Sequence, residues 1–176
     1  MRPLLLALKF EYILRKSKLC AMIEYRSPSS FFVRMATFVA MLIAIFIVLA
    51  LFRSGDYGLI VGTVLSILIL FTIAYLFSIS LHKVIVTETA VILKRRIGKI
   101  KIEKSGIVNI SELQFANLNL TYGSQGVFGF IGNTKDNSLS LVKDRRNMIK
   151  IISEGKTYII STEKPSELVS KIASSI

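Results

Sequence analysis

The chain is poor in the residues that most enzymes and metal sites use. Its 176 residues include one cysteine, Cys20, and one histidine, His82. A disulfide within the chain is therefore excluded, and so is a metal site built from cysteines. The acidic residues are scattered, without a conspicuous carboxylate pair or a grouping of serine, histidine and cysteine. We therefore expect no catalytic site, no bound metal and no cofactor.

Charge is also missing from two long stretches near the middle of the sequence. Residues Met35 to Phe52 and Leu59 to Leu81 contain no charged side chain, and only the polar segment Arg53 to Gly58 separates them. Each stretch is long enough to cross a ~30 Å hydrocarbon core as a helix at ~1.5 Å per residue. The sequence therefore predicts a transmembrane helical hairpin over residues 31–82 and an integral membrane protein.

The net charge of +12 is concentrated outside this hairpin. Seven basic and two acidic residues precede the first apolar stretch, most of them in a basic N-terminal segment at residues 1–30. The polar turn balances Arg53 with Asp56, and fifteen basic and eight acidic residues follow the second stretch. Under the positive-inside rule, this distribution predicts that both termini lie in the cytoplasm and that the hairpin crosses the cytoplasmic (inner) membrane.

Small residues recur at fourfold spacing within the two apolar stretches. Such residues let helices approach closely in lipid. They predict a packing face on each helix, either between the two helices, which the short turn favours, or against a neighbouring subunit. The packing residues are Ala36, Ala40, Ala44, Gly58, Gly62 and Ser66. Because neither stretch contains a charged group, we expect the hairpin to be an anchor rather than a transport pathway.

The remaining residues, 83–176, predict one cytoplasmic domain rich in strands. Residues 99–103 alternate between charged side chains and isoleucine, which is the pattern of a half-buried strand. The other strand candidates cover residues 83–86, 90–94, 107–110, 113–118, 139–142, 148–152 and 157–161. Gly155 supplies a hairpin turn between the last two, and an amphipathic helix begins near Pro165. We expect an α+β or all-β domain, a small antiparallel sandwich or barrel capped by the C-terminal helix.

Two segments of this domain carry a family resemblance. Tyr122 to Gly132 is rich in glycine and aromatic residues and precedes a hairpin, and Tyr158 to Pro165 opens the last helix. With the apolar helices before them, these motifs resemble the membrane-anchored bacterial PH-like domain proteins over about residues 31 to 176. The resemblance implies a bent antiparallel sheet of about seven strands, closed at one end by the C-terminal helix. It also implies homo-oligomers, since related domains form rings, and it leaves the biochemical role open.

A basic stretch at residues 94–104 is the strongest candidate for a binding surface. It lies on an early hairpin, where eukaryotic PH domains carry the ligands of lipid headgroups. The predicted lipid- or anion-binding residues are Lys94, Arg95, Arg96, Lys99, Lys101 and Lys104. Each cation near an anionic bilayer contributes about 1 kcal/mol, although a solvated face is an equally good interpretation. A second cluster, Lys143 to Arg146, is predicted to be a solvated hairpin turn.

The glycine-rich segment has to be distinguished from a nucleotide-binding loop. Gly123, Gly126, Gly129 and Gly132 recur at every third residue. No Gly-Lys-Ser/Thr sequence follows them and no helix starts there, as a phosphate loop requires. We expect the glycines to let strands bend or pack closely, while the neighbouring aromatic residues fill the core or form an exposed interaction rim. These aromatic residues are Tyr122, Phe128 and Phe130.

Together, these features favour a non-catalytic, membrane-anchored PH-like binding module. Its β-rich cytoplasmic surface would bind protein partners, anionic lipid or a second copy of itself. The alternative is an accessory or regulatory subunit of a membrane transport or enzyme complex, bound through the hairpin. We expect no nucleic-acid partner, because no basic recognition helix or aromatic stacking motif accompanies the positive charge.

Overall fold

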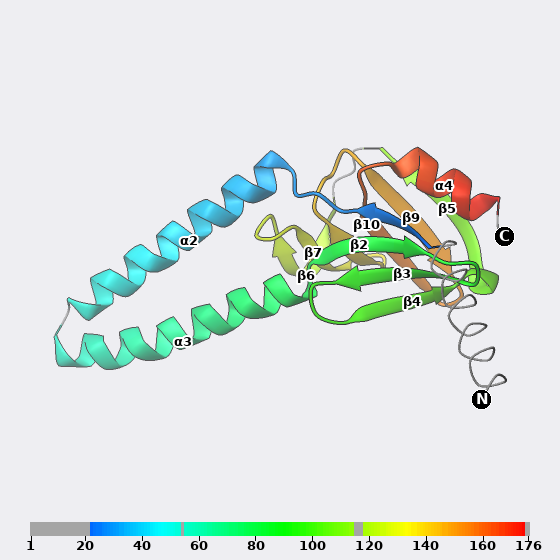
Figure 1. The fold of residues 1–176 in the computed structure, drawn as a ribbon. Helices are drawn as coiled ribbons and strands as arrows, with labels where there is room; N and C mark the ends of the chain where they lie inside the picture. The colour runs from blue at the N-terminus through cyan, green and yellow to red at the C-terminus, as the bar shows by residue number, and fades with distance from the viewer. Residues whose placement is uncertain (1–21, 54, 115–117, 175–176) are drawn as a thin grey trace, which may run out of the picture.

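The computed structural model describes residues 22–53, 55–114 and 118–174, which leaves most of the predicted N-terminal segment outside the description. Two long helices project as a hairpin from a pair of β-sheets, and a short helix lies at the far end of the sheets (Figure 1). The elements are β1 (Ile23–Arg26), α2 (Phe31–Phe52), α3 (Asp56–Ile79), β2 (Leu81–Val86), β3 (Ala90–Arg95), β4 (Lys99–Glu103), the 3-10 helix η1 (Lys104–Gly106), β5 (Ile107–Leu113), β6 (Leu120–Gln125), β7 (Phe130–Thr134), β8 (Leu139–Val142), β9 (Met148–Ser153), β10 (Lys156–Ser161) and α4 (Pro165–Ala173).

The two apolar stretches form α2 and α3. The hydroxyl of Ser30 caps α2 by accepting a hydrogen bond from the Val33 N–H at 3.3 Å. Gly55, with a φ of +85°, reverses the chain before α3, a conformation that glycine adopts without strain. Both helices are long and apolar enough to cross a membrane, and almost none of their apolar cores is buried within the protein. This agrees with the predicted hairpin in its length, its composition and its exposed apolar surface.

The first sheet is antiparallel, with the strand order β1-β2-β3-β4. The helical hairpin is inserted between its first two strands, because β1 precedes α2 while β2 follows α3. The sequence analysis does not predict β1, which falls in the segment assigned to residues 1–30. Only Tyr25 of its four side chains is buried, between the charged and exposed Glu24 and Arg26. So short a strand shows little periodicity. The pairing of Tyr25 with Val84, on the other side of the helical hairpin, is not visible in the local sequence.

The second sheet has six strands in the order β5-β9-β10-β8-β7-β6. All of its pairs are antiparallel except β8 with β10, which is parallel; the expectation of a purely antiparallel domain is therefore wrong at this pair. The described residues contain ten strands in two sheets, more than the resemblance implies, followed by the expected C-terminal helix. Residues 115–117 of the candidate strand at 113–118 lie outside the described residues, and Leu113 ends β5.

The glycine-rich segment forms the β6–β7 hairpin. Gly123 and Gly132 face each other across this pair, with φ values of +125° and +150°. A Cβ atom on either glycine would lie 2.1 Å from a carbonyl oxygen of the opposite strand, so the two backbones could not approach with any other residue. The expectation that the glycines permit close strand packing is confirmed at these two positions.

Buried side chains from both sheets and α4 form the main core. Leu168 and Ile172 of α4 are fully buried against it, which confirms the predicted amphipathic helix, with Pro165 in its first turn. The turn at Gly155 between β9 and β10 is also confirmed. A second, smaller cluster lies next to the helical hairpin. It includes Val33, the one fully buried side chain of α2 in the described residues.

Candidate functional site

Backbone hydrogen bonds attach the ends of both long helices to the sheets. The N–H of Ser30, before α2, donates to the Lys143 carbonyl at 3.1 Å. At the end of α3, the N–H of Arg96 donates to the Ser80 carbonyl at 3.0 Å, and the next N–H donates to the Ser78 carbonyl at 2.9 Å. The β3–β4 turn and the segment after β8 are therefore fixed at the level where the helices begin and end.

The β6–β7 turn makes a third attachment, between the two helices (Figure 1). The Phe128 N–H donates to the Thr37 hydroxyl of α2 at 2.9 Å. The Phe128 ring meets the Phe77 ring of α3 edge-on, with centroids 5.7 Å apart. A Cβ on Gly126 would lie 3.5 Å from the Cβ of Ala36. The turn therefore occupies the space between the helices at their domain ends and holds them apart.

Basic side chains gather where these attachments meet. We call the set the basic junction, and it comprises His82, Lys94, Arg96 and Lys143. The Arg96 guanidinium lies 4.6 Å from the centroid of the Phe77 ring, a cation–π contact at the end of α3. Lys83, whose charge also acts on His82, is not included because it makes an ion pair with Glu24 at 2.6 Å. Among the described residues, no carboxylate lies within ion-pair distance of the four members of the junction. The junction is therefore a concentration of positive charge that the rest of the described chain leaves uncompensated.

Lys143 is the least expected member, because only 6% of its surface is exposed. Burial, reinforced by the charge of Arg96, lowers the pKa of the Lys143 amine to about 8. The pKa of His82 is lowered by desolvation and then by the charges of Arg96 and Lys143. The carboxylate nearest in sequence, Asp144, instead accepts hydrogen bonds from the Arg146 N–H at 3.0 Å and from a neighbouring asparagine. A buried cation without an anion is costly unless a ligand supplies one.

The predicted lipid-binding residues separate into two groups. Lys94, Arg96 and Lys99 are exposed, and Arg95 half-buried, at the end of the β3–β4 hairpin beside α3. Lys101 is exposed but makes an ion pair with Glu103 at 3.1 Å.

Lys104 lies apart from the others. It is 7% exposed, in η1 at the opposite end of β4, and burial lowers its pKa. Its inclusion in an exposed anion-binding surface is therefore wrong. Continuing the alternating pattern of β4 would not predict this burial, because the strand ends at Glu103 and Lys104 begins η1.

The second basic cluster also differs from its prediction. Strands β8 and β9 are not paired, because β10 lies between them. Residues 143–147 therefore pass over the end of β10 and do not close a hairpin. This crossing buries Lys143 and brings the Arg145 guanidinium 5.0 Å from the centroid of the Phe130 ring. A hollow of about 470 Å³ beside them is lined by Arg145, Arg146 and Phe32 among others.

The three aromatic residues of the predicted interaction rim do not form one surface. Tyr122 is 64% exposed and accepts a hydrogen bond from the Asn133 side chain at 2.7 Å. Phe128 is half-buried at the base of the helices, as described above. Phe130 is 7% exposed and stacks on Phe32 of α2, with centroids 6.4 Å apart. Phe130 is therefore a core residue, which was the other interpretation of this segment.

The small residues on the two helices have different surroundings. Gly58 and Gly62 are buried near the hairpin turn, and a Cβ on Gly62 would lie 3.3 Å from the Cβ of Leu51. Close packing between the helices therefore occurs at this end. Nearer the domain, Ala40, Ala44 and Ser66 line open space between the helices. Ala36 faces the β6–β7 turn instead.

The described residues contain no cluster of three or more histidine, cysteine or carboxylate side chains that could hold a metal ion. No protein-family model, curated protein or solved structure matches this chain. The function is therefore argued from the geometry of the basic junction and the helices attached to it.

Proposed function

We propose that this chain is a non-catalytic, membrane-anchored PH-like module that binds anionic lipid at the surface of the membrane its own hairpin crosses. The observation that carries the proposal is the basic junction at the ends of both apolar helices, with no compensating carboxylate among the described residues. Cations at that height lie beside the headgroups, where each contributes about 1 kcal/mol of attraction to an anionic leaflet.

Exposed apolar side chains at the same level support this placement. Ile97, at the tip of the β3–β4 turn, is 71% exposed, and its N–H is bonded to the last turn of α3. Phe31, in the first turn of α2, is 79% exposed. Apolar side chains beside cations are typical of surfaces that enter the membrane interface.

The topology proposal rests on strand pairing as well as on charge. β1 precedes the hairpin and β2 follows it, and the two pair directly from Ile23–Val86 to Arg26–Lys83. The segments before and after the hairpin must therefore lie on the same side of any membrane that α2 and α3 cross. The excess of basic residues supports our proposal that this side is the cytoplasm and that the membrane is the inner membrane.

A pair of single-cysteine variants tests the placement. Cys20→Ser removes the one natural thiol, and Ile97→Cys or Lys156→Cys then places a fluorophore beside the helices or at the turn between β9 and β10. The full chain is reconstituted in nanodiscs of phosphatidylcholine and phosphatidylglycerol that carry a nitroxide quencher on one lipid or the other. We expect strong quenching at position 97 and little at 156. Quenching at 97 should be stronger when the phosphatidylglycerol carries the nitroxide.

Salt and topology controls complete the test. The preference for the anionic quencher should fall as salt rises, because screening acts within about 10 Å at 0.1 M. In cells, Arg53→Cys should react with an impermeant thiol reagent from outside, and Lys156→Cys only after permeabilisation. Equal quenching of positions 97 and 156, or no preference between the two lipids, would contradict the proposal. That result would favour the alternative in which the hairpin binds a membrane complex.

A further inference from the structure

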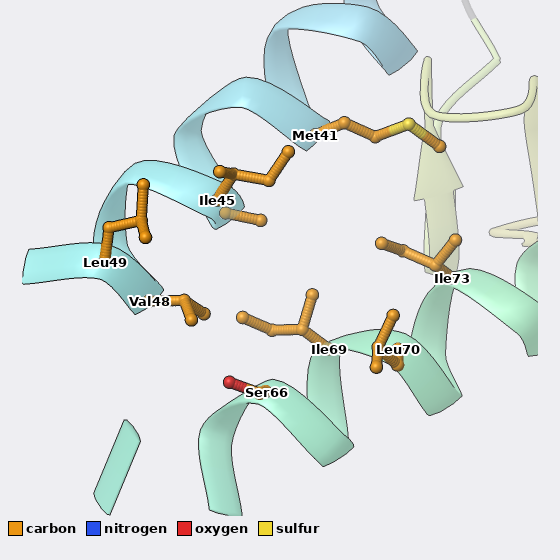
Figure 2. Close-up of a pocket in the computed structure, with 9 residues that line it drawn as sticks. Met41, Ile45, Val48, Leu49, Ser66, Ile69, Leu70 and Ile73 are labelled. Carbon is orange, nitrogen blue, oxygen red and sulfur yellow. The ribbon is translucent and has the colours of Figure 1, made fainter. Parts of the chain in front are cut away.

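The two long helices enclose an apolar cleft between them. It opens beyond the close contact at Gly62 and has a volume of about 410 Å³. Figure 2 shows side chains from both helices pointing into it, among them Val48 of α2 and Ile69 of α3. Its one hydroxyl among these side chains, on Ser66, donates to a carbonyl of its own helix at 2.6 Å. The cleft therefore offers an apolar ligand a lining without unsatisfied polar groups.

The cleft continues to the β6–β7 turn, which also contacts the basic junction. A second hollow of about 610 Å³ shares Met41, Ala44 and Ile73 with the first and ends against Phe128 of the β6–β7 turn. Phe128 contacts the Phe77 ring, on which the Arg96 guanidinium lies.

The residue after Phe128 connects the cleft to the second cation of the junction. A Cβ on Gly129 would lie 3.4 Å from Cγ of Lys143. The apolar groove and the two cations therefore lie against the same β6–β7 turn.

The attachment of the domain keeps this groove open. The β6–β7 turn stands between the helices at their domain ends, and one facing pair in its hairpin, Gly123 and Gly132, tolerates no other residue. In a bilayer, the resulting space is filled by a lipid chain or by another helix, since an unfilled gap loses dispersion contacts along its whole lining. The charge beside the β6–β7 turn decides between these occupants, because a lipid with an anionic headgroup matches both the cations and the apolar groove, whereas an apolar helix matches only the groove.

We propose that the cleft between α2 and α3 binds one acyl chain of an anionic glycerophospholipid whose phosphate contacts Arg96 and Lys143. The inference rests on the proposed function and deepens it, from a charged surface to a site for a single lipid. In this site the phosphate supplies the anion that Lys143 lacks, and the chain supplies the contacts that the helices do not make with each other.

Native mass spectrometry of the full chain, released from nanodiscs that contain both phosphatidylglycerol and phosphatidylcholine, tests the site. We expect a monomer that retains one phosphatidylglycerol, favoured about tenfold over phosphatidylcholine. Ala44→Phe places a ring in the cleft and should abolish retention, whereas the matched change Val39→Phe, on an exposed position of α2, should not. Arg96→Gln with Lys143→Gln should keep a retained lipid but remove the preference for phosphatidylglycerol.

A second measurement covers the case in which Ala44→Phe fails to fold. Phosphatidylglycerol with a photoreactive group in its acyl chain should crosslink the unaltered chain at α2 and α3 peptides that line the cleft. Retention by Ala44→Phe equal to that of the unaltered chain, or crosslinks confined to the outer helix faces, would overturn the site. So would a dimer that Ala44→Phe dissociates, because a second copy would then fill the cleft. Quenching at position 97 separates the two proposals, since it should persist in Ala44→Phe even when lipid retention is lost.

Discussion

The two ends of the β3–β4 hairpin carry charge of the same sign in opposite surroundings. Beside α3, Lys94 and Arg96 have no carboxylate within ion-pair distance among the described residues. Further along β4, Lys101 pairs with Glu103, and Lys104 is buried. One continuous basic run therefore divides into an end whose cations have no carboxylate partner among the described residues and an end where Lys101 is already paired and Lys104 is buried. If the proposed lipid binding holds, the positions of the carboxylates, and not the number of lysines and arginines, determine which end binds.

The largest expected effect concerns two glycines in other hairpins, one next to the long helices and one at the β9–β10 turn. Gly123→Ala, in the hairpin that holds the helices apart, would put a Cβ 2.1 Å from the Ile131 carbonyl oxygen at a φ of +125°. We expect a loss of about 3 kcal/mol or more in the free energy of unfolding. Gly155→Ala, at the β9–β10 turn, has a φ of +77° with no atom within 4 Å and should cost about 1 kcal/mol. Thermal unfolding of the full chain in detergent compares the two variants. Equal losses of stability would contradict the proposal that the β6–β7 hairpin depends on close packing at Gly123.

Charge reversal at the two ends should produce the next largest difference. Lys94→Glu with Arg96→Glu removes two exposed cations of the basic junction and adds two anions. Each cation contributes about 1 kcal/mol at an anionic surface. The preference for phosphatidylglycerol, measured by the two quenchers at position 97, should therefore fall at least about tenfold. Lys101→Glu with Lys156→Glu makes the same change in net charge away from the junction and should alter the preference less than about twofold. A similar fall in both double variants would mean that net charge alone explains the attraction.

Lys143 and Lys104 allow a pH test of the same comparison. The pKa of Lys143 is about 8 in the folded chain and about 10.4 when unfolded, so the unfolded state binds more protons between these values. Stability therefore rises with pH across that interval, and below pH 8 the buried charge destabilises the fold. In detergent without anionic lipid, Lys143→Met should be more stable than the unaltered chain at pH 7, by roughly 1 kcal/mol, and should lose the rise.

Lys104→Met is the matched variant at the other end. Burial and the charge of Lys171 lower the pKa of Lys104, but Glu88 acts in the opposite direction. The gain in the free energy of unfolding at neutral pH should therefore be smaller for Lys104→Met than for Lys143→Met. A larger gain in Lys104→Met would show that the greater strain from buried positive charge lies away from the helices.

Local patterns in the sequence predict the helices and most strands. The absence of charge over 18 residues in one stretch and 23 in the other is sufficient to predict α2 and α3, because a helix that long needs no distant partner to satisfy its backbone. The alternation at residues 99–103 and the stripe that buries Leu168 and Ile172 are equally local. The membrane environment predicted for the hairpin follows from the same local signal.

Features that depend on distant contacts could not be predicted in this way. β1 is recognisable only through its partner β2, more than fifty residues away across the hairpin. The burial of Lys143 results from a chain crossing at the end of a parallel pair, whereas the charged sequence Lys-Asp-Arg-Arg that it begins is typical of a solvated turn. The candidate site was therefore half predicted, with Lys94 and Arg96 found from sequence and Lys143 found only from the fold.

The smallest expected effect is the most specific to the junction, because His82 is the one histidine in the chain. Desolvation lowers its pKa first, and the charge of Arg96 lowers it further. Arg96→Gln should therefore raise the pKa of His82 in an NMR titration of its ring, and phosphatidylglycerol should raise it in the unaltered chain for the same electrostatic reason. Lys101→Gln, whose cation is already paired with Glu103, should leave the titration unchanged. If the lipid shifts His82 equally in Arg96→Gln and in the unaltered chain, then the anion binds elsewhere on the surface, and the difference between the two ends of the hairpin has no role in lipid binding.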